Sequence, residues 1–308
     1  MPEIVVAIPT FRRPTSLARL LGALEKIQTD ARLLVVVADN DPEGRAGYDL
    51  CRSICAHYRW PLDPIIAEQR GIAHVRNALV ERALGYPGAR LVAMLDDDEW
   101  PAPDWLMELL AVQQQTGADV VEGSVLFETK PLQHHWASEF DGIRDMRRPT
   151  GPVAMLEGAG NLLVTRACLE RLGAPWFDPA FALSGGEDRD FFERVKAAGG
   201  TFAWADEAIA HATVPEKRLT LDWVLRRAYA IGNAEMRIFL KHRPDVAARL
   251  AEYARIASAL LLSPLLALLL AAVPRRAADA LRRFSRNAGK LAALMGWRYN
   301  AYAVPHGD

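Results

Sequence analysis

The stretch LVAMLDDDE, residues 91–99, joins five apolar residues directly to four consecutive acids. An apolar run of this length is typical of a strand that is buried on both faces of a parallel sheet. Ligands bind such sheets beyond the carboxyl ends of the strands, where backbone amides and helix N-termini are exposed. We therefore expect the acids, Asp96 to Glu99, to line a binding site at one edge of a sheet.

Apolar runs and helical periodicity alternate along the first half of the chain. The runs predict strands over residues 4–8, 33–38, 64–67 and 91–95. Apolar residues at helical spacing predict a helix that begins near Pro14 and further helices over residues 48–57, 73–84 and 104–115. Four such strand–helix units predict an α/β fold with a doubly wound, Rossmann-like and mostly parallel sheet. Beyond them, we expect strands over 120–127, 162–165 and 202–205 and helices over 188–197 and 218–240.

Polar residues also follow the other predicted strands. Pro9 and Thr10 follow the first strand, and Asp39 follows the second. The four acids at 96–99 repel one another, and a divalent cation keeps such a cluster ionised at the least cost. Carboxylate oxygens favour Mg²⁺ or Mn²⁺, which pair readily with a diphosphate. The alternative is a solvated acidic turn that stabilises the N-terminus of the following helix.

Composition and missing motifs exclude several classes of protein. With 51% hydrophobic and 24% charged residues, the chain is neither disordered nor a coiled coil. Its net charge of −1 argues against a nucleic-acid-binding protein. The first strand is followed by TFRR, residues 10–13, and not by a glycine-rich phosphate loop. This absence argues against ATPases, nicotinamide dehydrogenases and sugar nucleotidyltransferases.

Seven motifs, taken in order, connect the chain to a known family. They are AIPTFRRP (7–14), VVVADND (35–41), EQRGIAHVRN (68–77), MLDDDEWPAPDWL (94–106), GAGNLLVTR (158–166), FDPAFALSGGEDRDFFERV (177–195) and VPEKRLTLDWVLRR (214–227). Together they resemble the family 2 glycosyltransferases of GT-A fold, especially the enzymes of succinoglycan-type exopolysaccharide assembly. The resemblance extends over residues 4–232.

The resemblance implies that the donor is a nucleoside diphosphate sugar, and a UDP-sugar in particular. Thr10 and Asp39 would hold the base and ribose. Asp96 and Asp98 match the family's D-x-D pair, with Asp96 at the ribose or donor sugar and Asp98 as the ligand of Mn²⁺ or Mg²⁺. The implied donor-binding set is Pro9, Thr10, Arg12, Asp39, Arg76, Asp96, Asp97, Arg218 and Arg227. On the residues alone, Asp39 could equally be a turn residue and Arg76 a solvated helix arginine.

The resemblance also implies positions for the catalytic base, for an extra metal ligand and for the acceptor. The base falls in the pair Glu187-Asp188, and we assign it to Asp188, with Glu187 orienting either the base or the acceptor. His211 is a candidate further metal ligand, with a surface or internally bonded histidine as the alternative. Gly160 and Asn161 are assigned to the acceptor side because small residues let a ligand approach the backbone; a tight turn is the alternative.

Asp188 and two further histidines also have interpretations that involve no chemistry. On the residues alone, Asp188 would simply cap the helix that follows it. His134 and His135 lie in a polar stretch, residues 128–152, that predicts an irregular loop. They would either shape the acceptor site or have no role.

The C-terminal region changes composition sharply. Residues 256–273 carry no charge and include Pro264. As a helix this stretch would be about 27 Å long, marginal for a bilayer core of about 30 Å. Residues 275–298 carry seven Lys or Arg and one Asp, a net charge of +6, in an amphipathic pattern. We expect a region that associates with an anionic membrane, so that deleting residues from 256 onward releases a soluble, donor-binding protein; a helical hairpin packed on the protein is the alternative.

These observations predict a catalytic domain over residues 1–243 and a membrane-associating region over 244–308. The nucleotide-binding half would cover about 1–127 and the acceptor-binding half about 128–243. The chain begins a strand close to Met1 without a basic leader or signal core, which predicts a position on the cytoplasmic face of the inner membrane, peripheral or monotopic.

The predicted function is metal-dependent, inverting transfer of a sugar from a UDP-sugar to a polyprenyl-diphosphate-linked saccharide during exopolysaccharide or other surface polysaccharide biosynthesis. No nucleic-acid partner is expected. A metal-dependent sugar nucleotidyltransferase and a catalytically inactive, membrane-bound scaffold are the alternatives. Four adjacent acids and a retained Glu-Asp pair argue against the scaffold, because an inactive protein gains nothing from keeping like charges together.

Overall fold

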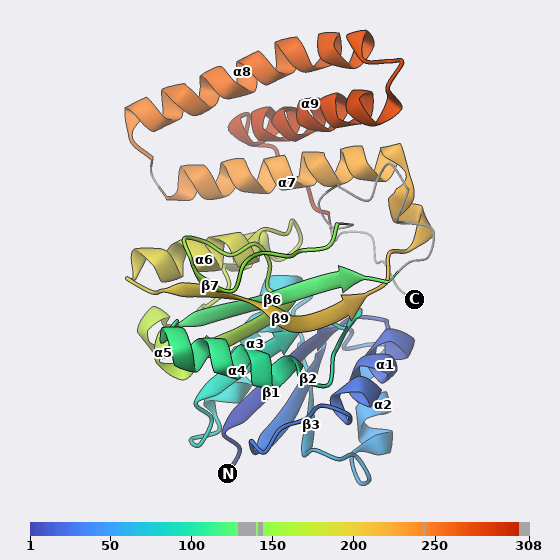
Figure 1. Ribbon diagram of the computed structural model, residues 1–308, viewed down its shortest axis with the longest axis vertical. Helices are drawn as coiled ribbons and strands as arrows, with labels where there is room; N and C mark the ends of the chain where they lie inside the picture. Colours follow the sequence, from blue (N-terminus) through green and yellow to red (C-terminus); the bar gives the residue numbers. More distant parts are fainter. Residues whose placement is uncertain (129–139, 141–143, 243, 302–308) are drawn as a thin grey trace.

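The computed structural model describes residues 1–128, 140, 144–242 and 244–301, and Figure 1 shows their arrangement. In the first half, four parallel strands form one side of the sheet in the order β3-β2-β1-β4. These are β1 (Ile4–Thr10), β2 (Leu33–Asp39), β3 (Leu62–Ile66) and β4 (Leu91–Leu95), with helices α1 (Pro14–Leu24), α2 (Ala46–Ile54), α3 (Ile72–Leu84) and α4 (Trp105–Thr116). The four predicted strand–helix units are confirmed.

The second half continues the sheet with mixed strand directions. Beyond β4 the order is β8-β6-β9-β5, and β7 pairs with β9. The strands are β5 (Glu99–Pro101), β6 (Val120–Phe127), β7 (Gly151–Val153), β8 (Asn161–Thr165) and β9 (Phe202–Ala212), with helices α5 (Arg166–Leu172) and α6 (Glu187–Ala197). β8 is antiparallel to both β4 and β6, whereas β6 and β9 are parallel. The sheet is therefore parallel over β3-β2-β1-β4 and mixed beyond β4.

Alternate residues of the buried strands enter two separate cores, one on each face of the sheet. On β1, Val5 and Ala7 join the core beneath α3, α5 and α6. Ile4, Val6 and Ile8 join the core beneath α1, α2 and α4. This alternation follows from the two-residue period of a strand, and it produces a sheet covered by helices on both faces.

The C-terminal helices form a further layer. They are α7 (Leu221–Lys241), α8 (Val246–Leu269) and α9 (Pro274–Leu294), with short 3-10 turns η2 (Pro179–Phe181) and η3 (Glu216–Leu219) before them. In Figure 1, α7 lies against the α6 side of the catalytic body, α9 follows, and α8 is outermost. The predicted apolar helix is longer than expected, because it begins at Val246 under an N-cap hydrogen bond from Ala248 N to Asp245 and keeps Pro264 inside it.

α9 is held tightly against α7. A Cβ added at Gly232 would overlap the backbone of Arg286, and one at Gly289 would overlap the carbonyl of Tyr229. The Asn233 amide donates to the carbonyls of Gly289 (3.2 Å) and Trp297 (2.9 Å). α9 therefore packs on the protein, as the hairpin alternative requires.

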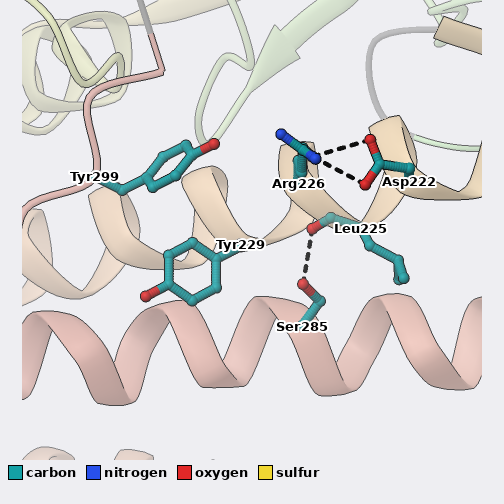
Figure 2. A pocket seen from close by; sticks show the side chains of 6 residues that line it. All are labelled: Asp222, Leu225, Arg226, Tyr229, Ser285 and Tyr299. Atoms are coloured by element: carbon teal, nitrogen blue, oxygen red, sulfur yellow. Dashed lines mark hydrogen bonds and ion pairs between the residues drawn. The ribbon is translucent and has the colours of Figure 1, made fainter. Parts of the chain in front are cut away.

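A pocket of about 210 Å³ lies between α7, α9 and Tyr299 (Figure 2). There the Ser285 hydroxyl donates to the Leu225 carbonyl at 2.7 Å, and the rings of Tyr229 and Tyr299 meet edge to face. Arg226, on the same stretch of α7, pairs with Asp222. These contacts fix the last described residues of the chain to the α7–α9 pair.

The basic face predicted for α9 is partly used inside this layer. Arg286 pairs with Glu235 of α7, and Lys290 lies 2.7 Å from Glu252 of α8. By contrast, α8 buries only one narrow stripe, centred on Ile256 and Ser263. Within the described residues, α8 is the one helix that is long and apolar enough to cross a membrane, and 17% of its apolar window is buried.

Candidate active site

Asp97, the second of the four acids, is bound by the end of β1 and by the loop that follows it. It accepts hydrogen bonds from the Thr10 hydroxyl (2.9 Å) and from Arg13 (3.0 Å). Arg13 also donates to Asp98 at 3.0 Å. Burial raises the pKa of Asp97 to about 7, with Arg13 opposing the shift and Asp98 adding to it. Asp97, just beyond β4, is therefore hydrogen-bonded to the last residue of β1. Polar residues that follow these two strands meet at one edge of the sheet, as the sequence predicts.

Arg13, which the sequence did not single out, is the arginine of this loop that pairs with the acid cluster, whereas the prediction placed the neighbouring Arg12 in the donor-binding set. The Arg12 side chain is about half exposed and pairs with Asp41 at 2.7 Å. Arg12 has a left-handed backbone (φ 55°), which turns the chain so that the next side chain enters the site. Nothing in two adjacent arginines predicts which one faces inward. A donor contact by Arg12 stays a prediction, and Pro9 lies buried within β1.

Asp39, at the end of β2, is 1% exposed and uses both carboxylate oxygens on backbone amides. Oδ1 accepts from Asp41 N (3.0 Å), and Oδ2 accepts from Gly47 N (2.8 Å) and Tyr48 N (3.0 Å). These bonds close the loop between β2 and α2, which is the turn role that the sequence left open. A contact with ribose stays a prediction.

Glu99 lies in β5, which the sequence did not predict because a three-residue strand that contains an acid has no apolar pattern. Its carboxylate lies against Gly160, where an added Cβ would be 2.5 Å from Oε1. Burial, with the charges of Asp96 and Asp98, raises the pKa of Glu99 well above its ordinary value. The absence of a side chain at Gly160 thus leaves room for the Glu99 carboxylate. An acceptor contact at Gly160 stays a prediction.

The side chains of Asp96 and Asp98 have the chemistry that a divalent cation requires. The side chains of Asp96 and Asp98 are 35% and 31% exposed, and both present hard oxygen ligands. Among the residues that the structure describes, no three His, Cys, Asp or Glu side chains converge to hold a metal ion. A cation at Asp98 would therefore take most of its ligands from a bound diphosphate and from water.

Of the remaining predicted residues, Arg218 is the one placed against this cluster by a contact between described residues. Arg218, in η3, reaches to 3.7 Å from Asp98. Arg227 lies half-buried on α7. The His211 Nδ1 lies 3.0 Å from Glu128, and its ring stacks on Trp100. Metal ligation by His211 stays a prediction, as does a donor contact by Arg227.

Arg76 connects the acid cluster to the predicted base. This α3 side chain is 5% exposed, so it is not a solvated helix arginine. It donates to Asp96 (2.9 Å) and to the Ala159 carbonyl (2.8 Å), and its Nε lies 3.7 Å from Glu187. Asp96 and Glu187, ninety-one positions apart in the sequence, thus both lie beside the buried guanidinium of Arg76.

Glu187 and Asp188 begin α6 and have different surroundings. Gly186, with φ 92°, is the N-cap, so Asp188 lies within the helix and does not cap it. Glu187 is 4% exposed, and burial together with Asp188 raises its pKa, which Arg76 opposes. Asp188 is half-buried, and its charge acts on Asp96 as well as on Glu122. The pair therefore faces the acid cluster.

Glu122 and Asn161 hold the backbone and side chains around residues 157–161 in place. Glu122, which the sequence analysis missed inside an apolar strand, accepts from Glu157 N (2.8 Å) and Gly158 N (3.0 Å). Asn161 is 1% exposed, accepts from Trp105 Nε1 (2.7 Å) and donates to two carbonyls. Its amide is thus used inside the fold, and an acceptor contact by Asn161 stays a prediction. His134 and His135 lie outside the described residues.

Solved structures define the class to which this fold belongs. Mannosyltransferase PcManGT from Pyrobaculum calidifontis, in complex with GDP-Man and Mn²⁺, gives a TM-score of 0.63 at 20% identity, covering 96% of this chain and 88% of that one. TarS 1–349 of S. aureus, in complex with UDP-GlcNAc, gives 0.51 at 15% identity, covering 96% and 93%. The fold is that of the GT-A glycosyltransferases, with an apolar helix added near the C-terminus.

Sequence comparisons then give the family. Residues 5–171 match glycosyl transferase family 2, and residues 91–304 match glycosyl transferase family group 2. The succinoglycan biosynthesis protein ExoM of Rhizobium meliloti is 33% identical over 242 residues, which are 77% of this chain and 75% of that protein. Glycosyltransferase AglE of Haloferax volcanii is 25% identical over 79% and 76%. The chain belongs to glycosyltransferase family 2, which confirms the resemblance seen in its motifs.

Proposed function

We propose that this protein is an inverting glycosyltransferase that moves a sugar from a UDP-sugar to a polyprenyl-diphosphate-linked saccharide in exopolysaccharide or other surface polysaccharide biosynthesis. The observation that carries the proposal is the bridge formed by Arg76, which brings the Asp96–Asp98 cluster and the Glu187–Asp188 pair into one site. A site for sugar transfer needs these two parts together, one for the donor diphosphate and one for the acceptor hydroxyl. The succinoglycan role of ExoM and the UDP-GlcNAc bound to TarS support the choice of product and donor.

The proposed chemistry follows from the positions of the charged groups. Asp188, half-buried on the first turn of α6, accepts the proton of the acceptor hydroxyl as the sugar is transferred. Glu187, buried against Arg76, fixes the start of that helix. Arg13 and Arg218 place positive charge beside Asp98, where the diphosphate would lie. A divalent cation, Mn²⁺ or Mg²⁺, when held by Asp98, would offset the charge of the departing diphosphate.

A lipid-linked acceptor requires the protein to reach a membrane, and the outer face of α8 supports this part of the proposal. Leu261, Leu268 and Leu269 are more than 70% exposed, and Arg275 and Arg276 follow at the end of the apolar segment. α8 lies along α9, so crossing a bilayer would strip Ile256 and Glu252 of their partners. We therefore infer that α8 lies flat in the cytoplasmic leaflet, as a monotopic anchor.

A ligand screen tests the donor and the metal together. Thermal denaturation is measured with UDP, GDP and their sugars, with and without Mn²⁺, because a ligand that binds only the native state raises its stability. We expect a UDP-sugar with Mn²⁺ to give the largest shift and Asp98→Ala to remove its metal-dependent part. Retained Mn²⁺-dependent UDP binding in Asp98→Ala would contradict the assignment of the metal. Binding without any turnover would favour the inactive scaffold.

A flotation assay tests the membrane face. Each basic residue near an anionic surface contributes about 1 kcal/mol, in addition to the apolar burial. We expect full-length protein to float with anionic liposomes and the double variant Leu265→Glu/Leu268→Glu to remain in solution, with UDP binding unchanged. Met107→Glu, at an exposed apolar residue on α4, is the matched control and should still float. A stable dimer that hides the α8 face, with no liposome binding, would overturn this part.

A further inference from the structure

The segment that carries the predicted base is joined to the last turns of α7 by several polar contacts. Arg237 donates to the Ser184 hydroxyl at 2.7 Å and to the Ala180 carbonyl at 2.6 Å. Its guanidinium also lies over the ring of Phe181, 4.6 Å from the centroid. One α7 side chain thus binds three residues of the stretch that leads into Glu187 and Asp188.

One turn further along α7, Lys241 also binds this segment. Its Nζ lies 2.6 Å from both carboxylate oxygens of Asp190 and 2.7 Å from Asp178. The His242 Nε2 lies 3.1 Å from Asp190. Lys241 stands at the C-terminus of α7, where the helix dipole favours positive charge. The carboxylate of Asp190 is fully buried and depends on Lys241, because a buried charge without a partner is costly.

The backbone of the turn before α6 explains why contacts from α7 are needed to fix it. Gly185 and Gly186 both have positive φ (76° and 92°) and no side chain of their own to fix the turn. Gly186 packs against Ala234 of α7, where an added Cβ would lie 2.9 Å from the alanine Cβ. The contacts at Ser184 and Asp190 therefore fix the backbone on both sides of a turn whose glycines have high conformational freedom. Asp188 lies between these two fixed points.

We propose that the C-terminal part of α7 is a positioning element for the base, in which Arg237 and Lys241 are positioning residues that act through Asp188. The inference rests on the proposed function, because it takes Asp188 as the base. It assigns α7 a role in the chemistry in addition to its role as the support of α9. Displacement of a reacting group by about 1 Å can cost about 100-fold in rate, so loss of the contacts should lower kcat.

Arg237→Gln is the main test, because its partners are neutral and no buried charge is left behind. Arg194→Gln is the matched control: Arg194 lies in the last turn of α6 and donates to the carbonyls of Pro175 (2.8 Å) and Trp176 (2.9 Å). Both variants lose comparable bonds, but only Arg237 touches the turn before the base. UDP release is measured with UDP-glucose, UDP-galactose and UDP-N-acetylglucosamine in the presence of a bacterial lipid extract. Hydrogen exchange is measured over residues 182–190.

We expect Arg237→Gln to lower kcat at least about 10-fold with KM for the donor nearly unchanged, and to speed exchange in residues 182–190. Arg194→Gln should change neither, and Arg237→Lys should restore part of kcat. In the Asp188→Asn background, Arg237→Gln should add little, since it acts through the same group. Equal effects of Arg237→Gln and Arg194→Gln, or an additive effect on Asp188→Asn, would overturn the inference. Normal turnover in Asp188→Asn alone would instead refute the proposed base.

Discussion

The contact between α7 and α9 makes a prediction whose size can be worked out from the structure. In the interior of a helix, replacing Gly by Ala normally stabilises by about 0.5–1 kcal/mol. Gly22 on α1 has no atom within 4 Å of an added Cβ, so Gly22→Ala should show this gain. At Gly289 the added methyl would overlap the Tyr229 carbonyl and lie 3.0 Å from Asn233 N. Backbone cannot yield as a side chain can, so the two helices must separate.

The expected cost combines two effects. Overpacking costs about 1–3 kcal/mol, and the weakened amide contacts of Asn233 add about 1 kcal/mol. After the propensity gain, Gly289→Ala should be destabilised by about 1–3 kcal/mol, which is about 2–4 kcal/mol below Gly22→Ala. Denaturant unfolding in mild detergent measures both variants. Equal or greater stability of Gly289→Ala than of wild type would refute the packing described for α9.

This packing also changes what truncation should do. Deletion from residue 256 onward, which the sequence alone suggested would release a soluble donor-binding core, uncovers Gly232, Asn233 and Met236 on α7. Because α7 also holds the segment that contains Asp188, we now expect the truncated protein to be unstable. The membrane face is better tested by substitutions on the outer side of α8.

Three further predictions concern single side chains. Asn161→Ala should cost about 1–3 kcal/mol, because buried partners such as the Trp105 indole are left without a hydrogen bond; a change confined to acceptor KM, with normal thermal stability, would instead favour an acceptor contact. Burial raises the pKa of Glu122 well above 4.5, so its stabilising contribution is present below that value and is lost as pH rises through the folded-state pKa. Wild type should therefore lose melting temperature relative to Glu122→Gln as pH rises above 4.5, and parallel pH profiles would contradict this. Arg13→Gln should cost more stability than Arg12→Gln, because Arg13 pairs with the buried Asp97 whereas the Arg12 side chain is about half exposed and solvent screens its charge; the reverse order in thermal melts would exclude the inward position of Arg13.

The strands β1, β2 and β4 could be predicted closely because burial on both faces leaves an uninterrupted apolar run. β4 covers Leu91–Leu95, the predicted residues, and polar side chains at the ends of neighbouring strands meet as expected. Strand direction could not be predicted in the same way. An apolar run such as that of β8 reads alike in either direction, and its antiparallel pairing depends on the long connection before it.

Other features depended on tertiary contacts that leave no local pattern. β5 begins at Glu99, an acid whose carboxylate lies where a side chain at residue 160 would stand, so the strand requires a glycine there. Arg13 faces inward because the backbone of Arg12 is left-handed. The charges of α9 predicted a membrane-facing helix, but Arg286 and Lys290 find carboxylates on α7 and α8. A composition can identify such charges without identifying their partners.

The account depends most on single-displacement transfer with Asp188 as the base. Proton NMR of the product sugar, recorded as transfer proceeds from a UDP-sugar, measures the configuration of the new linkage for wild type and for Asp188→Asn. We predict a product of inverted anomeric configuration from wild type. Asp188→Asn should bind UDP and metal normally and form the same product on the order of 100-fold more slowly. A product that retains the donor's configuration, or near-normal transfer by Asp188→Asn, would contradict the account.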